Sequence, residues 1–337
     1  MKVLLNCHLP FLLAHGGTQV QVEQTKAGLE KIGVEVEYLR WWDESQTGDI
    51  LHQVGWVPSD IIALAHKKGW KVAMTILLTE TCNRSSRELF VRKLMVRGML
   101  GAPLPKRFKS RLQWHAYHLS DQMIVGLEVE RRIVEEVYGV PNERVAVVPL
   151  GLSDTYLKAA PASRAGEHLI CTGTIGPSKN SLELAGYAAS AKVPLLFVGK
   201  PFDYASDYWK QFEKLVDGTI VKHTPHVGSQ QELIALLQQA RGYVLMSRYE
   251  NWSLAAHEAA ACRLPMLLPD QPWSRERFGD QAAYFPKPGH GSAADAVRTF
   301  YDQCPNLSPS NTRLCSWVEV AEMLRTIYER MLARNTK

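Results

Sequence analysis

The chain has 337 residues, of which 46% are hydrophobic and 22% charged, a composition that is typical of globular domains and excludes disordered and collagen-like chains. At roughly 150 residues per domain, this length suggests two domains. The formal net charge of +5 is modest, and no stretch reaches the ~18 uninterrupted apolar residues that a membrane-spanning helix needs. The six cysteines form no CxxC pair and are expected as reduced, buried thiols of a cytoplasmic protein.

Short apolar, β-branched runs alternate with helical patterns along the whole chain. This alternation is typical of βαβ units and parallel sheets. The apolar start, interrupted by Asn6, His8 and Pro10, is expected as a buried first strand rather than a signal peptide. The predicted strands are 3–5, 34–39, 50–53, 72–77, 123–125 and 145–148 in the first half, and 169–172, 195–198, 220–222, 243–246, 265–268 and 283–285 in the second. We therefore expect the α/β class, with two doubly wound, Rossmann-like domains.

The expected domain boundary lies at residues 158–168, KAAPASRAGEH, which are rich in Ala, Pro, Ser and Gly. This places an N-terminal domain at 1–157 and a C-terminal domain at 169–315. Residues 316–334 follow a helical stripe that includes Trp317 and Leu324, and we expect a closing helix there. Ligands of such sheets bind beyond the carboxyl ends of the strands, so we expect the site in the loops that follow strands.

Two adjacent glycines, Gly16 and Gly17, separate the first predicted strand from a predicted helix. Glycine lets backbone N–H groups approach a ligand, and the start of a helix favours an anion. The pattern is not GxGxxG, so the dinucleotide fingerprint is absent. A tight turn without a ligand explains the pair equally well.

Residues 84–111 carry nine Lys or Arg and one Glu, a local charge of +8, so the remainder of the chain sums to −3. Apolar side chains are interleaved with these charges, which suits attachment to an anionic membrane surface. A solvated helix over the first domain's core is the alternative, and nucleic acid is disfavoured because aromatic residues are few. The basic residues expected to contact a membrane are Arg92, Lys93, Arg97, Lys106, Arg107 and Lys109.

The most informative segment is 243–270, YVLMSRYENWSLAAHEAAACRLPMLLPD. A predicted strand ends at Ser247, and Ser253 is a candidate cap for an alanine-rich helix. The free N–H groups at the start of this helix suit a diphosphate. Glu250 precedes the helix and Glu258 lies one turn inside it, where each can accept hydrogen bonds from ligand hydroxyls, at ~1.5–3 kcal/mol per charged bond.

The spacing from Glu250 to Glu258, with Pro265 beyond it, resembles the donor site of the family 4 retaining glycosyltransferases, which have two Rossmann-like domains facing a cleft (the GT-B fold). Other segments match in the family's order along nearly the whole chain. Residues 144–156, RVAVVPLGLSDTY, are similar to the family's V-I-P-N-G-V-D passage, and 173–179, GTIGPSK, resemble its G-R-x-x-x-x-K loop. The closing helix is similar to the family helix that returns to the first domain.

The resemblance implies a role for each matching residue. Glu258 would hold the ribose hydroxyls of the nucleotide, and Glu250 the hydroxyls of the donor sugar. Lys179 would pair with phosphate oxygens and stabilise the leaving nucleotide. The other expected donor-binding residues are Gly16, Gly17, Gly173, Thr174, Arg248, Asn251, Trp252, Ser253 and Leu254. No metal or other cofactor is expected, since the chain contains no Asp-x-Asp and the diphosphate charge would be met by amides and cations.

The sequence departs from the family pattern at two positions. Thr174 stands where the family has an Arg, for which Arg248 or Lys200 could substitute. The family often has a His after the fourth strand, where this chain has Leu77 or Leu78, with Glu80 just beyond as a candidate catalytic residue.

The function implied is transfer of a sugar, with retention, from a nucleotide-sugar to a hydroxyl of a glycan or lipid-linked glycan in a cell-surface polysaccharide pathway. It would take place in the cytoplasm or at the inner membrane face. The alternatives are a nucleotide-sugar epimerase and an inactive nucleotide-sugar-binding protein.

Overall fold

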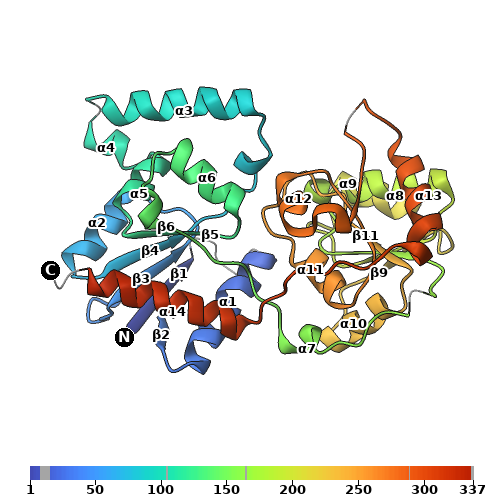
Figure 1. The fold of residues 1–337 in the computed structure, drawn as a ribbon, viewed down its shortest axis with the longest axis horizontal. Helices are drawn as coiled ribbons and strands as arrows, with labels where there is room; N and C mark the ends of the chain where they lie inside the picture. The colour runs from blue at the N-terminus through green and yellow to red at the C-terminus, as the bar shows by residue number, and fades with distance from the viewer. Residues whose placement is uncertain (8–15, 104, 164, 288, 335–337) are drawn as a thin grey trace. The chain divides into compact units, whose positions relative to one another are not determined.

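The computed structural model describes residues 1–7, 16–103, 105–163, 165–287 and 289–334 (Figure 1). The chain forms two compact units, the first from residues 1–151 and 315–337 and the second from 152–314. Each unit contains one six-stranded sheet, and its strands pair in parallel. The predicted α/β class with two doubly wound sheets is confirmed.

The first unit has the strand order β2-β1-β3-β4-β5-β6. Its strands are β1 (Lys2–Cys7), β2 (Glu35–Tyr38), β3 (Ile50–Val54), β4 (Lys71–Thr75), β5 (Gln122–Val125) and β6 (Val145–Val147). Its α-helices are α1 (Gly17–Lys31), α2 (Ser59–Lys67), α3 (Ser86–Gly101), α4 (Lys106–Lys109), α5 (Gln113–Leu119), α6 (Glu128–Glu136) and α14 (Trp317–Ala333), with 3-10 turns η1 (Thr81–Asn83) and η2 (Asn142–Arg144). The central strands are buried along their whole length, as expected of a parallel sheet that helices cover on both faces.

The second unit has the strand order β12-β11-β10-β7-β8-β9. Its strands are β7 (Leu169–Thr172), β8 (Leu195–Val198), β9 (Val221–Thr224), β10 (Gly242–Val244), β11 (Met266–Leu268) and β12 (Ala283–Tyr284). Its helices are α7 (Asp154–Leu157), α8 (Ser181–Ala191), α9 (Asp207–Leu215), α10 (Gln230–Gln238), α11 (Leu254–Ala261), α12 (Pro272–Phe278) and α13 (Ala293–Gln303), with 3-10 turns η3 (Pro177–Lys179), η4 (Gly279–Gln281) and η5 (Cys304–Asn306). Residues 158–168 contribute contacts within this unit, where Ala162 N donates to Cys262 O at 2.8 Å.

The last helix, α14, packs against α1, and Figure 1 shows it in red alongside the sheet of the first unit. Gly28 on α1 permits this approach, since a Cβ there would lie 2.6 Å from the carbonyl oxygen of Trp317. Tyr328, fully buried, faces His52 with its hydroxyl 2.6 Å from Nδ1, and His52 Nε2 lies 2.7 Å from Thr75 Oγ1. The predicted return of the final helix to the first unit is confirmed.

The predicted strands are all present, with small differences at their ends. The largest are two residues, at the carboxyl ends of β1, β4, β9 and β10. At β4, which ends at Thr75 rather than residue 77, the reason is a buried carboxylate: Leu78 N donates to Glu130 Oε1 at 3.0 Å instead of continuing the ladder. Within the described part of the chain, no helix combines the length and the apolar character needed to cross a bilayer.

Candidate functional site

The helix α11 begins just beyond the carboxyl end of β10, as the segment 243–270 predicted. Ser253 is its N-cap and accepts a hydrogen bond from Ala256 N at 3.3 Å, which confirms the predicted cap. Ala256, Ala259 and Ala260 are buried, so the helix lies close to its neighbours because its inner face carries only methyl groups. The remaining amides of the first turn have no intrahelical partner and are oriented to bind an anion.

Glu258 lies one turn inside α11. Burial raises its pKa to about 7, because removing a carboxyl group from water disfavours its charged form. Its electrostatic neighbours include the phenols of Tyr156 and Tyr243, and burial raises the pKa of both. A carboxyl group in such surroundings gains strongly from the hydroxyl donors of a ligand.

Lys179 and Glu250 form an ion pair. Glu250 is only 8% exposed, and it precedes α11, whereas Lys179 ends the 3-10 turn η3. The pair joins two segments that the sequence singled out separately. It places one cation and one carboxylate together beside the amide-rich start of α11.

The loop 173–179 is positioned by glycine and by an unusual asparagine. Gly173 has φ +132°, and a Cβ on Gly199 would lie 2.0 Å from the Gly173 carbonyl oxygen, so both positions require glycine. Asn180 adopts the left-handed conformation, and its Nδ2 donates to Met246 O at 3.0 Å. This bond fixes the loop 173–179, which ends in Lys179, to the chain that follows β10.

Arg248 lies beside this loop, where sequence reasoning named it as a substitute for the missing arginine at Thr174. Its backbone N donates to Ser178 O at 2.9 Å, and its Nε donates to Asn180 Oδ1 at 2.6 Å. Its Nη2 lies 3.4 Å from Glu183 Oε1. The guanidinium is thus held by Asn180, the residue after Lys179, at the end of the loop in which Thr174 supplies no charge.

His257 was not predicted, yet it orders the segment that precedes α11. Its ring stacks on Trp252 with centroids 4.4 Å apart and an interplanar angle of 7°. Arg277 Nε lies 3.2 Å from His257 Nε2, and His257 Nδ1 lies 2.7 Å from Ser253 O. Because Arg277 can only donate, Nε2 accepts and Nδ1 donates to Ser253. Burial, with Arg277 close by, lowers the pKa of His257 to about 3 and keeps the ring neutral.

Three buried polar atoms near Glu250 in the sequence have no hydrogen-bond partner among the described residues: Ser247 Oγ, Asn251 Nδ2 and Trp252 Nε1. Each of these residues is at most 8% exposed. An unpaired buried polar group costs about 1–3 kcal/mol. Unpaired polar atoms at the same end of the same strand indicate a region that is completed by a polar ligand.

Residues 168–307 match the family model described as glycosyl transferases group 1. These residues, called the group 1 domain below, lie within the second unit. The match agrees with the family resemblance of the sequence, which implies a retaining, nucleotide-sugar-dependent glycosyltransferase. No curated protein matches the chain.

The whole chain is similar to solved structures of the GT-B fold. Sucrose-phosphate synthase from Thermosynechococcus elongatus is 16% identical, with a TM-score of 0.66 and 99% of each chain covered. AviGT4, a glycosyltransferase of avilamycin A biosynthesis, is 17% identical, with a TM-score of 0.61 and 98% of each chain covered. HepE from Anabaena, solved with UDP and glucose, is 11% identical, with a TM-score of 0.59 and 97% of this chain and 99% of that one covered. At these identities the likeness establishes the fold.

The first unit carries the remaining candidates, outside the group 1 domain. Gly16 has φ +155°, a conformation that favours glycine, and Gly17 begins α1. Glu80 is exposed on the loop between β4 and η1. Sequence reasoning missed the fully buried Glu130, whose Oε2 accepts from Gly126 N at 2.8 Å while Oε1 accepts from Leu78 N. The sequence feature that could have pointed to Glu130 is a Glu in the first turn of a helix that follows a strand.

The basic stretch forms α3 and α4, and it exposes apolar side chains as well as charges. Phe90 is 60% exposed and Phe108 68%. Arg92 differs from the other expected membrane-contacting residues because its Nε donates to Tyr138 OH at 2.9 Å, which fastens α3 to the core. The side chain of Lys106 lies outside the part of the chain that is described.

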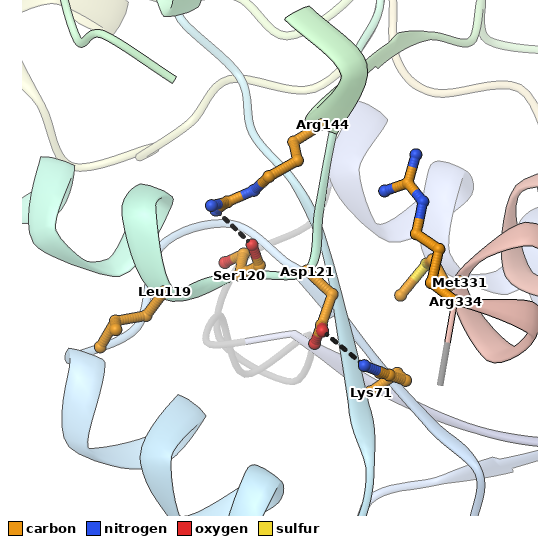
Figure 2. Close-up of a pocket in the computed structure, with 7 residues that line it drawn as sticks. All are labelled: Lys71, Leu119, Ser120, Asp121, Arg144, Met331 and Arg334. Carbon is orange, nitrogen blue, oxygen red and sulfur yellow. Dashed lines mark hydrogen bonds and ion pairs between the residues drawn. The ribbon is translucent and has the colours of Figure 1, made fainter. Parts of the chain in front are cut away.

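A separate cavity of about 220 Å³ lies at the amino end of β4 and β5 (Figure 2). Its charged residues serve the fold. Arg144 Nη2 donates to three carbonyl oxygens at the end of α5, including Ser120 O at 2.6 Å. Asp121 accepts from Lys71 Nζ at 3.1 Å. This edge is opposite to the strand ends at which ligands of parallel sheets bind.

Proposed function

We propose that this protein transfers a sugar from a nucleotide-sugar held at the start of α11 to a hydroxyl of a glycan or lipid-linked glycan acceptor. The reaction would belong to the synthesis of a cell-surface polysaccharide. The observation that carries the donor assignment is the joint position of Glu250, Glu258 and Lys179 around the amide-rich first turn of α11, inside the group 1 domain.

Each group has a definite role in this proposal. The diphosphate binds the amides from Asn251 to Leu254 and the side chains of Lys179 and Arg248. Glu258 accepts hydrogen bonds from the ribose hydroxyls, and Glu250 from the hydroxyls of the sugar. The unpaired Asn251 Nδ2 and Trp252 Nε1 become hydrogen-bonded by this ligand.

Catalysis follows from charge that develops on the leaving nucleotide. As the bond between the anomeric carbon and the phosphate oxygen breaks, negative charge grows on the diphosphate. A lysine and preorganised amides that face this charge stabilise the transition state more than the ground state. For retention the acceptor attacks the face that the nucleotide leaves, and the departing phosphate oxygen takes the proton of the acceptor hydroxyl.

The first unit would bind the acceptor and attach the enzyme to an anionic membrane. The support for attachment is the chemistry of α3 and α4, in which exposed Phe90 and Phe108 stand among Lys93, Arg97 and Arg107. Each basic residue near an anionic surface contributes about 1 kcal/mol. Flotation with anionic vesicles should recover the enzyme, and charge reversal at Lys93 and Arg97 should release it. Equal recovery with neutral vesicles would contradict this part of the proposal.

The experiment that tests the proposal is a donor screen. Purified enzyme is incubated with UDP-, GDP-, ADP- and TDP-sugars at substrate concentrations, and release of the nucleoside diphosphate is measured with and without acceptor glycans. Uridine donors come first because the HepE structure contains UDP and glucose. We expect release with one base, accelerated by an acceptor. Conversion of the donor into an isomeric sugar without acceptor would favour an epimerase instead.

A further inference from the structure

The connection between β2 and β3 presents two indole rings to solvent. Trp41 is 56% exposed and Trp42 is 80% exposed. Tryptophan is highly buried on average, because apolar surface that stays in water gives up hydrophobic stabilisation. Adjacent exposed apolar side chains of this size indicate a binding surface.

The turn that carries the two rings is held rigidly. Arg40 Nε and Nη2 donate to Asp43 Oδ2 at 3.0 and 2.8 Å, across the two tryptophans. Gln46, 4% exposed, accepts from Arg40 N at 2.8 Å and donates to Tyr38 O at 3.0 Å. A ligand that binds to a turn already ordered in this way loses less conformational entropy.

Three charged groups of the turn, Glu37, Arg40 and Asp43, are hydrogen-bonded to one another. Arg40 Nη1 also donates to Glu37 Oε2 at 2.9 Å, and Asp43 Oδ1 accepts from Ser45 N and Oγ at 3.0 and 2.6 Å. Hydrogen bonds from Lys2, Gln46 and Arg40 lower the pKa of Glu37 to about 2, so it stays charged. Beside the exposed Glu44, the turn therefore offers flat aromatic surface with indole N–H donors. This surface suits the C–H face and hydroxyls of a pyranose better than a phosphate, which the Glu44 carboxylate would repel.

The turn is also located where a substrate would reach it. It follows β2, which pairs in parallel with β1, and the chain after β1 leads to Gly16 at the start of α1. Both connections therefore leave the carboxyl edge of the sheet, at which ligands of open α/β sheets bind.

We propose that Trp41 and Trp42 form a saccharide-binding subsite that holds a sugar residue of the acceptor glycan, away from the hydroxyl that reacts. This inference rests on the proposed glycosyl transfer. A membrane is the less suitable partner because α3 is bonded through Arg92 to Tyr138, which precedes β6, and β6 and β2 are opposite edges of the sheet. Figure 1 shows α3 and β2 at opposite ends of this unit.

The test uses neutral oligosaccharides as probes. The full-length enzyme is labelled at its tryptophan indole nitrogens, and maltotetraose, cellotetraose and chitotetraose are titrated while the Nε1–H signals are recorded. Trp41→Phe and Trp42→Phe assign the two signals. We expect one tetrasaccharide at least to shift both, and the double variant W41A/W42A to weaken its affinity at least fivefold. Phe202→Ala, which removes an 81% exposed aromatic ring from the second unit, is the matched control and should leave the affinity unchanged.

Failure of this inference and failure of the proposed function give different results. Glu258→Ala should weaken donor binding at least 100-fold and leave the indole shifts with tetrasaccharide intact. W41A/W42A should weaken tetrasaccharide binding and leave the donor affinity unchanged. No shift with any probe, or equal loss in Phe202→Ala, would overturn the subsite. Loss of vesicle binding in W41A/W42A with unchanged glycan affinity would assign the rings to a membrane and also overturn it.

Discussion

The loops that follow β10 in the second unit and β4 in the first unit both carry candidate carboxylates, in contrasting surroundings. Glu250 is buried, bonded to Lys179 and followed by a helix that contains a second, half-buried carboxylate. Glu80 is exposed, and the buried carboxylate near it, Glu130, accepts bonds from backbone amides. The comparison indicates that the proposed donor site is built into the fold of the group 1 domain, whereas the β4 loop is supported structurally and leaves its own carboxylate to solvent.

The largest expected effect is at Glu258. Glu258→Ala should weaken donor binding at least 100-fold, because the ribose hydroxyls lose charged acceptors worth ~1.5–3 kcal/mol each. Isothermal titration with the nucleotide-sugar found in the donor screen measures this directly. Glu213→Ala, which removes an exposed carboxylate from α9 of the same unit, is the control and should bind normally. Unchanged affinity in Glu258→Ala would remove the donor-site assignment.

The second-largest effect is expected at Lys179. Lys179→Ala is expected to lower kcat about 10- to 100-fold, since a cation that faces the leaving diphosphate acts mainly in the transition state. Lys179→Arg should recover part of the loss because the charge remains. Steady-state rates at saturating donor distinguish this from a binding defect, and a change confined to KM would contradict the catalytic role.

His257 tests whether the surroundings of α11 matter as much as its carboxylates. His257→Ala should weaken donor binding about tenfold, because the carbonyl of Ser253 and the ring of Trp252 lose their partner. His257→Asn keeps a hydrogen-bond donor, and its donor-substrate affinity should lie between those of wild type and His257→Ala. Since the pKa of His257 is about 3, its ring is neutral throughout pH 5 to 8, and the difference in donor affinity between wild type and His257→Ala should not change over this range. Equal affinities in all three proteins would assign His257 to stability alone.

Glu258 also predicts a pH-dependent stability. Its pKa is raised from 4.5 to about 7 in the folded protein, so folding favours the neutral form. The contribution of Glu258 to the free energy of unfolding is therefore most favourable below pH 4.5. This contribution is lost as the pH rises through 7, because the folded protein then has to hold the charged carboxylate. Glu258→Gln should be more stable than wild type by about 1–3 kcal/mol at pH 8.5, and by much less at pH 5. Denaturant titrations at the two pH values test this, and equal differences at both would contradict it.

The smallest effect is expected in the first unit. Glu80→Ala should change kcat less than threefold if the exposed carboxylate has no part in catalysis, and it should leave donor affinity unchanged. A loss of 100-fold in kcat would instead show that Glu80 reaches the reacting hydroxyl. That result would reverse the contrast between the two loops.

Sequence reasoning recovered the parts of the molecule that short-range pattern encodes. Most strands are compact apolar runs, although β2 and β9 carry charged or polar side chains, and Ser253 with its alanine-rich helix is a local signal for a capped helix. The pairing of Lys179 with Glu250 joins residues far apart in sequence, so no local pattern contained it. The same holds for Arg277 against His257, whose contact depends on how α12 packs beside α11. The high number of basic residues in the stretch 84–111 also could not tell that the Arg92 side chain turns inward to bond Tyr138.

The contact of α14 with the first sheet has a consequence for how the protein is made. The hydroxyl of Tyr328 closes a buried chain of polar groups with His52 and Thr75, and burial keeps His52 uncharged with a pKa of about 4. Residues 1–151 on a ribosome therefore lack one wall of their own interior until residues 317–333 have been synthesised. The unit that begins translation first is thus completed last, after the contiguous second unit has had time to form.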